Sequence, residues 1–329
     1  MSEMLFNNKT KEILKDEKIG IVILNYNSFS DTIECVNSIK LQKLSNYKIY
    51  IVDNASINNS IEILKGQFSN DLKVDIIENE VNLGFSAGNN VGFKKAIMEG
   101  CEFILCVNSD VIFKENSIKI MLSVIKSDDN CGVVGPKVYC ADGSIQNCNK
   151  GILTPSILLL RKRGLRIFDW FGKEKKYTYR SYKYDKRLIL DGMVSGCCFL
   201  IRSDLLRQIN YLDENVFLYH EEDILGAKIR NTHKYYVCLE PSAEVIHLGG
   251  RSTSKANEFI RYHEFKSSMY YLWNYTNVGS LQYNFISFVF SFMWFFESII
   301  NHKYWKYYKQ LKNDYKNIRK NGKCFVEKK

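Results

Sequence analysis

The chain has 329 residues, of which 46% are hydrophobic and 14% aromatic, and its formal net charge at pH 7 is +10. This composition excludes an intrinsically disordered protein, and the length predicts one large domain or a domain with an appendage. The ten cysteines lack paired CxxC spacing and residues 1–18 lack an apolar core, so we expect no zinc site, no secretory signal and reduced thiols in the cytoplasm.

The first half of the chain alternates strand and helix signals. Short runs rich in Ile and Val predict buried parallel strands over residues 19–24, 48–52, 73–77 and 103–107. Helices are expected between them, beginning near Ser30, after Ser56 and over residues 90–98. This β-α-β-α order predicts a doubly wound α/β sheet with right-handed crossovers.

The second half of the chain is less regular. Residues 161–187 mix basic and aromatic side chains without a clean period, and we expect a long, partly mobile loop of the kind that forms lids or binding segments. A glycine-punctuated turn then leads into a strand that includes Ile201. The acidic run 221–223 precedes a predicted helix over residues 224–230.

The C-terminal end carries most of the positive charge. Residues 301–329 contain ten Lys or Arg against two acids, and they follow residues 281–300, the most apolar stretch of the chain. A nucleic-acid binder would more often carry its charge along a folded groove, so this order predicts an anionic membrane surface as partner. A membrane-spanning helix would place Glu297 against lipid, which favours a helix lying in the interface; a buried or dimer-forming helix is the alternative.

Asp110 follows an apolar strand in the sequence Asn108-Ser109-Asp110, at the carboxyl edge of the predicted sheet. In open α/β sheets, ligands bind at that edge. A divalent cation bound to a diphosphate needs only one or two protein carboxylates, because phosphates and waters supply the remaining ligands. Asp110 is therefore the first candidate for a metal and nucleotide site.

Two further motifs belong to the same half of the chain. Asp53 ends the second predicted strand, where a carboxylate can accept hydrogen bonds from a base or ribose or can simply cap a helix. Residues 82–89 place two glycines at a loop-to-helix junction, where backbone N–H groups can approach an anionic or sugar ligand. A tight turn that packs a helix on the sheet is the alternative, since the run matches neither GxGxxG nor a P-loop.

The second half offers an acidic and a histidine motif. Three carboxylates at a helix start suit the helix dipole, but a carboxylate crowded by acids in a cleft can also serve as a general base. His247 ends another apolar run and precedes a Gly-Gly loop with Arg251. Although a lone His is more often structural, this loop favours a phosphate-facing site, because glycine permits close approach and Arg pairs with phosphate oxygens.

Together these motifs resemble the inverting family 2 glycosyltransferases of the GT-A fold, most closely their rhamnosyltransferase-like and capsular-polysaccharide branch. The stretches that carry the resemblance are Ile23-Leu24-Asn25-Tyr26-Asn27, Val52-Asp53-Asn54-Ala55-Ser56, Asn82-Leu83-Gly84-Phe85, Asn108-Ser109-Asp110, Ser195-Gly196, Glu222-Asp223 and His247-Leu248-Gly249-Gly250. The resemblance implies an α/β fold with a Rossmann-like, mostly parallel sheet flanked by helices. Its implied parts are a polar lead over 1–18, a GT-A domain over 19–255 with a nucleotide-binding half (19–112) and an acceptor half (113–255), and a helical, membrane-associating extension over 256–329.

The resemblance also implies roles for individual residues. The expected donor-binding residues are Asn25, Tyr26, Asp53, Asn82, Gly84, Asn108, Asp110 and Arg251. Asp110 and His247 would bind Mn²⁺ or Mg²⁺, and Ser195 and Gly196 would contact the acceptor. Because Asn108-Ser109-Asp110 has only one acid where the family motif has two, the metal is expected to be held weakly.

The general base is expected in the Glu-Asp pair. An ungapped count back from Pro241 and His247 favours Asp223, and a one-residue slip would choose Glu222. The following helix, Ile-Leu-Gly-Ala-Lys-Ile-Arg over residues 224–230, lacks the further acid and the Arg position of many relatives, which leaves the acceptor contacts open.

The implied reaction transfers a sugar from a UDP- or dTDP-sugar to a hydroxyl of a glycan acceptor, expected to be lipid-linked, in bacterial capsule, O-antigen or cell-wall synthesis. The protein would be cytoplasmic and peripheral at the inner face of the cell membrane, with a homodimer as a further possibility. A nucleotidyltransferase would need a Gly-rich loop with Lys or Arg, which residues 23–28 lack. A non-catalytic assembly subunit is disfavoured by the joint presence of Asp53, Asp110 and Asp223.

Overall fold

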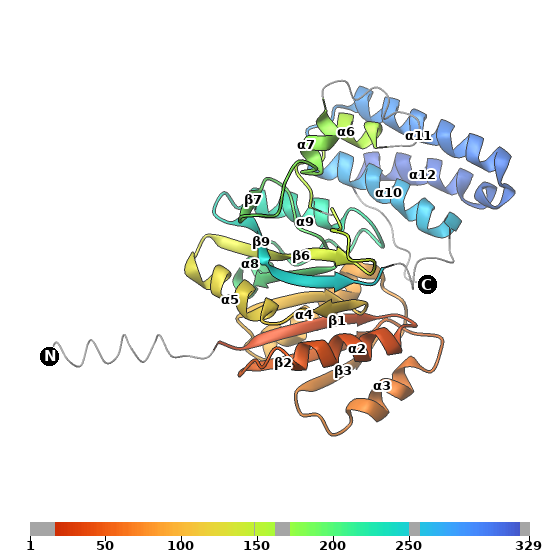
Figure 1. Ribbon diagram of the computed structural model, residues 1–329. Helices are drawn as coiled ribbons and strands as arrows, with labels where there is room; N and C mark the ends of the chain where they lie inside the picture. Colours follow the sequence, from red (N-terminus) through yellow and green to blue (C-terminus); the bar gives the residue numbers. More distant parts are fainter. Residues whose placement is uncertain (1–16, 148, 162–171, 250–256, 323–329) are drawn as a thin grey trace.

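The computed structural model describes residues 17–147, 149–161, 172–249 and 257–322. It consists of a nine-stranded sheet with helices on both faces and a helical bundle that packs at one end, drawn in blue in Figure 1. The predicted α/β class is confirmed.

The strands of the first half match the sequence prediction to within two residues. The sheet order is β3-β2-β1-β4-β8-β6-β9-β5, with β7 paired to β9 off this path. Its strands are β1 Ile19–Asn25, β2 Tyr47–Asp53, β3 Val74–Glu78, β4 Phe103–Asn108, β5 Val111–Phe113, β6 Cys131–Cys140, β7 Leu188–Leu190, β8 Cys198–Arg202 and β9 Tyr236–His247. Strands β1 to β4 pair in parallel, which brings their carboxyl ends to one edge.

The second half adds antiparallel strands to this parallel core, so the complete sheet is mixed. Strand β8 runs antiparallel between β4 and β6, while β5 and β7 both run antiparallel to β9. The β5–β9 pairing sets Val111 opposite His247. The end of β9 therefore lies beside the start of β5, just after the turn that follows β4. Two segments far apart in the sequence thus meet at the carboxyl edge of the parallel strands.

The helices cover both faces of the sheet. Apolar residues of α2 (Phe29–Lys40), α3 (Ser60–Phe68) and α5 (Ser117–Ser127) form one buried cluster with the sheet. A second cluster on the sheet includes α4 (Gly84–Met98), α8 (Ser203–Gln208) and α9 (Glu221–Arg230). This layering is the doubly wound arrangement that the first half of the sequence predicts.

The C-terminal helices share a third core with the second half of the sheet domain. The elements involved are α6 Pro155–Leu160, α7 Lys173–Tyr177, α10 Asn257–Tyr275, α11 Ser280–Ile300, the short 3₁₀ helix η2 His302–Tyr304 and α12 Trp305–Asn321. Their cluster includes Ile224 of α9 and is built largely from aromatic side chains, among them the fully buried Trp294. The bundle is therefore packed onto α9.

Two helices differ from the sequence prediction. Helix α4 begins at Gly84, six residues before the predicted start, because Gly88 and Gly92 allow it to lie close to β1: a Cβ at Gly88 would come within 2.7 Å of Leu24. The loop predicted over 161–187 contains α7, whose Tyr177 is buried, so the loop expectation is wrong for that helix. Residues 162–171 of the predicted loop lie outside the described residues.

Helix α11 confirms the apolar helix predicted over 281–300. It is long and apolar enough to cross a membrane by length and composition alone, and 33% of its most apolar window is buried inside the protein. Glu297 points to the bundle, where Nε of Arg261 on α10 donates to its carboxylate at 2.6 Å. The apolar row that remains exposed consists of Leu281, Phe285, Phe288, Phe292, Phe296, Ile299 and Ile300.

Candidate active site

The carboxyl ends of β1, β2 and β4 bring the predicted nucleotide residues to one edge. Asn25 and Asp53 are partners in the register of β1 and β2, and Asn108 lies opposite Leu24 at the end of β4. Tyr26 follows β1 directly and is partly buried. The structure therefore gathers these positions as the parallel order requires.

Asp53 is the centre of a buried polar network at this edge. Nδ2 of Asn25 donates to its carboxylate at 2.6 Å, and both the backbone N–H and the hydroxyl of Ser56 donate to it at 2.9 and 2.7 Å. Asn25 in turn accepts from the Thr32 hydroxyl at 2.8 Å. Asp53 does not cap a helix, because α3 begins only at Ser60; its carboxylate instead fixes the loop that follows β2.

The loop around Gly84 is tied to the second half of the chain. Gly84 has φ +78°, and a Cβ there would lie 2.4 Å from the carbonyl oxygen of Phe217. The N–H of Phe85 donates to that same oxygen at 2.9 Å. On the other side, Oδ1 of Asn82 accepts from Gly84 N–H and from Asn54, both at 2.9 Å. A glycine is thus required where the loop between β3 and α4 contacts the segment leading into α9.

Asp110 and His247 meet as the sequence predicts. Oδ1 of Asp110 lies 3.3 Å from Nε2 of His247, and both side chains are mostly buried, with exposed fractions of 14% and 17%. The other ring nitrogen, Nδ1, lies 2.9 Å from Oε1 of Gln146. Burial alone would raise the pKa of Asp110, but the hydrogen bond and charge of His247 outweigh it and hold that pKa below its usual value.

This pair suits a divalent cation that brings its own further ligands. A carboxylate oxygen and an imidazole nitrogen 3.3 Å apart are both groups that bind divalent cations, and the contact of Nδ1 with Gln146 fixes the orientation of the ring. No group of three or more His, Cys, Asp or Glu side chains placed to hold a metal occurs in the described part of the chain. Arg251, expected near the diphosphate, lies outside the described residues.

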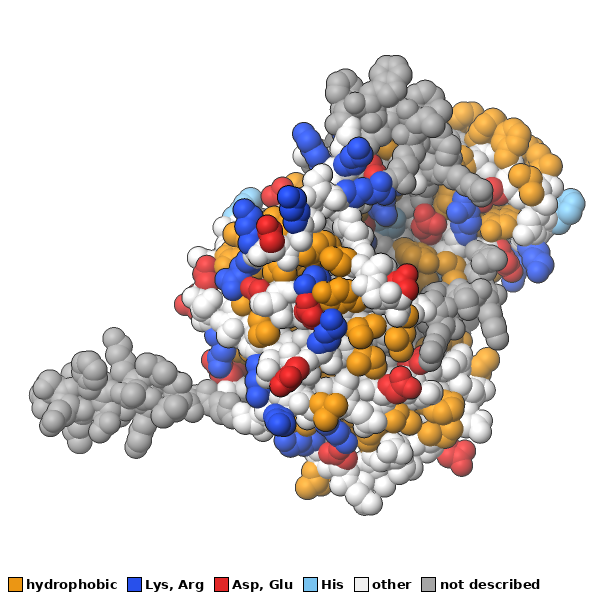
Figure 2. Space-filling model, viewed as in Figure 1, with side chains coloured by type: hydrophobic (Ala, Val, Ile, Leu, Met, Phe, Trp, Pro, Cys, Tyr) orange, Lys and Arg blue, Asp and Glu red, His pale blue; other side chains and the backbone are white. Residues whose placement is uncertain are grey.

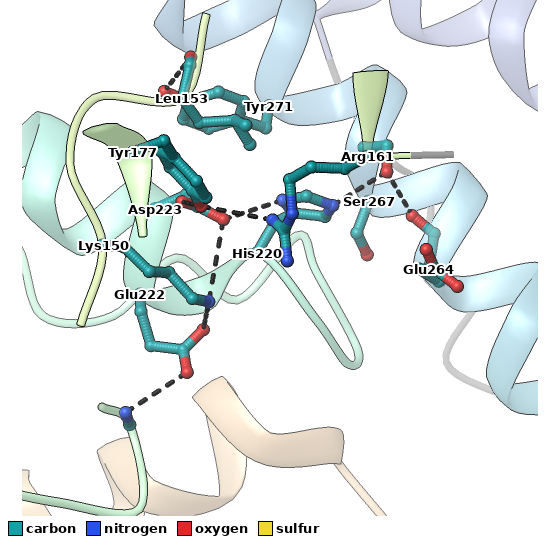
Figure 3. A network of polar contacts seen from close by, with 12 residues as sticks. Lys150, Leu153, Arg161, Tyr177, His220, Glu222, Asp223, Glu264, Ser267 and Tyr271 are labelled. Atoms are coloured by element: carbon teal, nitrogen blue, oxygen red, sulfur yellow. Dashed lines mark hydrogen bonds and ion pairs between the residues drawn. The ribbon is translucent and has the colours of Figure 1, made fainter. Parts of the chain in front are cut away.

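The acidic run begins at an unusual backbone bend. Tyr219 and His220 both adopt left-handed conformations, with φ of 69° and 66°, which is uncommon for residues with bulky side chains. This bend directs the first turn of α9 at the sheet edge. Figure 3 shows the polar network that results, with Lys150 between Glu222 and Asp223.

Glu222 faces the Ser195-Gly196 turn. The N–H of Gly196 donates to its Oε1 at 3.2 Å, and Nζ of Lys150 donates to Oε2 at 3.0 Å. A Cβ at Gly196 would come within 2.8 Å of the same carboxylate, so the turn and the acid are in close contact. The hydroxyl of Ser195 is turned to Cys197 instead. The Glu222 side chain is 19% exposed.

Asp223 is enclosed. Its side chain is 1% exposed; Tyr177 donates to Oδ1 at 2.8 Å, and Nδ1 of His220 lies 2.9 Å from Oδ2. Nε2 of His220 lies 2.8 Å from the hydroxyl oxygen of Ser268 on α10, and that hydroxyl donates its own proton to the backbone carbonyl of Glu264. Burial would raise the pKa of Asp223, but the charge of Lys150 and the bonds from His220 and Tyr177 hold it well below its usual range.

Glu221 differs from its two neighbours. Its Oε2 is buried and has no hydrogen-bond partner within the part of the protein that the structure describes. Burial, followed by the nearby charge of Glu222, raises the pKa of Glu221 to about 8. Three consecutive carboxylates therefore experience three different environments.

Sequence reasoning missed Lys150, Tyr177 and His220. None of them lies in a recognisable motif, and Lys150 and Tyr177 reach the acids only through long-range packing. Lys150 is attached to the sheet domain by a bridge between its backbone and that of Met193. His220 offered the one local signal, since it immediately precedes the acidic run.

A mixed α/β sheet with a carboxylate–histidine pair and an acidic helix start at one edge is the architecture of a GT-A glycosyltransferase. Residues 20–209 match the profile of Glycosyl transferase family 2. The chain belongs to this family.

Curated relatives agree with this assignment. The chain is 26% identical over 225 residues to the "Low-salt glycan biosynthesis hexosyltransferase Agl10" of Haloferax volcanii, covering 68% of this chain and 65% of that protein. It is 33% identical over 119 residues to "Glycosyltransferase GlyG" of Streptococcus pneumoniae, covering 36% and 38%. A Mycobacterium tuberculosis N-acetylglucosaminyl-diphospho-decaprenol L-rhamnosyltransferase is 25% identical, covering 63% and 68%. The chain thus spans less than two thirds of the first two of these relatives.

Solved structures share the fold. GalNAc-T7 in complex with UDP, GalNAc and Mn²⁺ superposes with a TM-score of 0.53 at 14% identity, covering 78% of this chain and 50% of that one. Residues 1–349 of Staphylococcus aureus TarS give a TM-score of 0.50 at 15% identity, covering 92% and 90%. The mannosyltransferase PcManGT of Pyrobaculum calidifontis, in complex with GDP-Man and Mn²⁺, gives 0.51 at 14% identity, covering 81% and 70%.

The environment of Glu221 has a measurable consequence for stability. Because its folded-state pKa lies near 8 and an unfolded Glu titrates near pH 4.3, the stability it contributes is complete below about pH 4 and is lost as the pH rises to 8. The slope is at most about 1.4 kcal/mol per pH unit. We expect Glu221→Gln to remove this slope from the free energy of unfolding, measured by urea denaturation between pH 4 and 9.

The exposed Glu80 provides the control, since Glu80→Gln changes the same chemical group on the surface. Its curve should run parallel to that of the unchanged protein. Parallel curves for both variants would show that Glu221 is ionised at neutral pH like an ordinary surface acid.

Proposed function

We propose that this protein is an inverting glycosyltransferase that moves a sugar from a UDP- or dTDP-sugar to a hydroxyl of a glycan acceptor. The observation that carries the proposal is the meeting of Asp110 and His247 at the same sheet edge that Asn25 and Asp53 border. Acceptors of bacterial surface polysaccharides, such as capsule, O-antigen or cell wall, are the proposed substrates. The names of two curated relatives, a glycan biosynthesis hexosyltransferase and an N-acetylglucosaminyl-diphospho-decaprenol L-rhamnosyltransferase, support a glycan acceptor.

The donor would lie along the carboxyl ends of β1, β2 and β4. The residues proposed to line its site are Asn25, Tyr26, Asp53, Asn82, Gly84, Asn108, Asp110 and Arg251. Asp53 and Asn25 fix one another, so the loops that would contact the nucleotide are organised before it binds. Such preorganisation lowers the entropic cost of binding.

Mn²⁺ or Mg²⁺ is the proposed cofactor, held by Asp110 and His247. A bound divalent cation would stabilise the charge of the diphosphate leaving group. Two protein ligands leave most coordination positions for diphosphate oxygens and water. The metal is therefore expected to bind well only together with the nucleotide. Relatives in fold that were crystallised with Mn²⁺ support this choice.

Glu222 is the better candidate for the general base, although the ungapped count favours Asp223. Glu222 reaches the Ser195-Gly196 turn, proposed to contact the acceptor, and it keeps some exposure, whereas Asp223 is enclosed by Tyr177, His220 and Lys150. A base must reach the acceptor hydroxyl proton directly or through one water. Glu222 would remove that proton as the new bond forms, and Asp223 would hold Lys150 and His220 in place.

The acceptor is proposed to be lipid-linked, and the protein to be cytoplasmic and peripheral to the membrane. Apolar side chains gather along α11 at the upper right of Figure 2, and within the described part of the chain several of them stay exposed. Lys and Arg residues of α12 are exposed beside it. An apolar row next to basic side chains matches an interfacial helix on an anionic membrane.

We also propose the division into residues 1–18, 19–255 and 256–329, with halves 19–112 and 113–255. The shared core between α9 and the C-terminal bundle supports treating the extension as a structural support of the acceptor half.

Replacement of the base tests the mechanism. We expect Glu222→Gln to lower kcat by roughly 10²–10⁴-fold, because proton transfer by a positioned side chain contributes that much. The assay measures release of nucleoside diphosphate from the donor that stabilises the protein most in a thermal-shift screen. Asp223→Asn should lower the melting temperature, since it removes a charge that Lys150 needs. A stable but inactive Asp223→Asn beside an active Glu222→Gln would reverse the assignment.

Removal of the metal ligand tests the donor site. We expect UDP or dTDP to raise the melting temperature of the protein only when Mn²⁺ is present, because ligands that bind the folded state stabilise it. Asp110→Asn should abolish this shift, and EDTA should do the same for the unchanged protein. Asp129→Asn, whose side chain is 99% exposed, is the control that should retain it. No shift with any nucleotide in the presence of metal would refute the donor site.

The exposed row on α11 can be tested by flotation with vesicles. We expect replacement of Phe288, Phe292 and Phe296 by Ser to reduce recovery with phosphatidylglycerol vesicles about tenfold or more, because each Phe would lose a favourable transfer of about 1.5–3 kcal/mol. The matched control replaces Ile57 and Leu72, which are exposed on other elements, by Ser. Unchanged flotation combined with loss of a dimer in light scattering would identify the row as a subunit interface.

A further inference from the structure

A cavity opens between the three long helices of the C-terminal bundle. It has a volume of about 480 Å³ and lies between the end of α10, the first two turns of α11 and the last turns of α12. Its lining residues are Trp273, Ser280, Tyr283, Asn284, Ser287, Tyr315, Lys316, Arg319 and Lys320. None of its lining residues belongs to the candidate active site, and nothing in the proposed reaction uses it.

The cavity combines basic side chains with neutral hydrogen-bonding groups. Lys316, Arg319 and Lys320 border it, and among its described lining residues there is no acid. Nη1 of Arg319 donates to Oδ1 of Asn284 at 2.7 Å, which holds the guanidinium at the cavity wall and leaves its other N–H groups available. The acid on the same helix, Asp314, is turned away to Lys266 on α10.

The floor of the cavity is formed by buried aromatic side chains. Tyr283 and Tyr315 are 1% and 2% exposed, and the hydroxyl of Tyr283 donates to the backbone oxygen of Tyr315 at 3.0 Å. The ring of Trp273 packs edge-to-face on Tyr283, with centroids 5.0 Å apart. The cavity walls are therefore part of the packed bundle, while the basic groups sit at its rim.

The cavity lies directly beside the exposed apolar row of α11. Successive residues of an α-helix are rotated by about 100°, so Asn284 lies only about 60° around the helix from the line through Leu281, Phe285 and Phe288. These three side chains are 87%, 60% and 67% exposed. A polar, basic recess thus borders an apolar strip on one helix.

We propose that this cavity binds the phosphate of an anionic phospholipid headgroup, with the acyl chains lying along the exposed row of α11. Arginine pairs with phosphate oxygens through several N–H groups, the two lysines add positive charge, and Ser280 and Ser287 supply hydroxyls. Basic pockets between helices at the membrane face bind lipid headgroups in this way. The inference deepens the membrane association given under Proposed function and rests on it.

Binding of a lipid headgroup in this cavity would differ from diffuse electrostatic attraction of the protein to an anionic membrane surface. Diffuse attraction depends on the number of basic residues near the surface, whereas a headgroup site depends on the three that line the cavity. Helix α12 offers a direct comparison, because Lys306, Lys309 and Lys312 are exposed on the same helix and lie outside the cavity.

The test uses the full chain and dihexanoyl phosphatidylglycerol below its critical micelle concentration, so that no charged surface is present. We expect saturable one-to-one binding by isothermal titration calorimetry, at least about tenfold weaker with dihexanoyl phosphatidylcholine, because charge-assisted contacts are the stronger ones. The variant Lys316→Gln, Arg319→Gln, Lys320→Gln should lose this binding. The variant Lys306→Gln, Lys309→Gln, Lys312→Gln, which removes the same charge, should keep it.

One further variant and one further ligand distinguish a lipid site from a phosphate site. Ser287→Phe fills the cavity without a change in charge and should also abolish binding. Inorganic phosphate that binds as tightly as the lipid would overturn the lipid assignment in favour of a free phosphate site. Equal losses in the two triple variants, or no binding to the unchanged protein, would overturn the cavity site. Release of nucleoside diphosphate from the donor should be the same in both triple variants, so failure here leaves the proposed reaction standing.

Discussion

The second half of the sheet domain depends on the burial of adjacent carboxylates at the start of α9. Taking such charges out of water is costly unless partners replace the lost hydration. Lys150, Tyr177 and His220 are those partners, and they come from three separate segments. The contacts of these side chains with the acids fix the position of each segment. The loop before α6, the helix α7 and the bend before α9 are therefore ordered together.

The same requirement explains why the C-terminal bundle is packed where it is. His220 is completed by Ser268, and the hydroxyl of Tyr271 donates to the backbone oxygen of Leu153 at 2.9 Å. Both contacts come from α10 and end on segments that surround Asp223. The C-terminal bundle therefore supports the candidate active site in addition to exposing the apolar row of α11. Loss of α10 would leave the acids without part of their support.

The sequence predicted the features that local pattern and chain order control. Buried runs of Ile and Val gave the first four strands, and the parallel order gave the common edge at Asn25, Asp53 and Asp110. His247 was found because a strand end followed by two glycines is a local signal. Its contact with Asp110 required only that β5 and β9 pair. The GT-A class was predicted from the family resemblance that these motifs carry.

The features that the sequence did not predict depend on contacts between residues that are distant in the chain. The start of α4 was missed because glycine usually breaks helices, while here Gly88 and Gly92 allow the helix to approach β1. Lys150 was missed because its position beside Glu222 results from packing across 72 residues of chain. Counting along the chain could not show that Glu222 stays partly exposed while Asp223 is enclosed, since that difference depends on the bend at Tyr219 and His220.

The contact between Gly84 and Phe217 joins the loop after β3 to the loop before α9. The carbonyl oxygen of Phe217 accepts from Phe85 N–H at 2.9 Å, and two residues separate Phe217 from the left-handed His220. Any displacement of the loop at Gly84 is therefore passed to the segment that orients the acids. These two loops cannot evolve independently, because a substitution that reshapes one loop also moves the other.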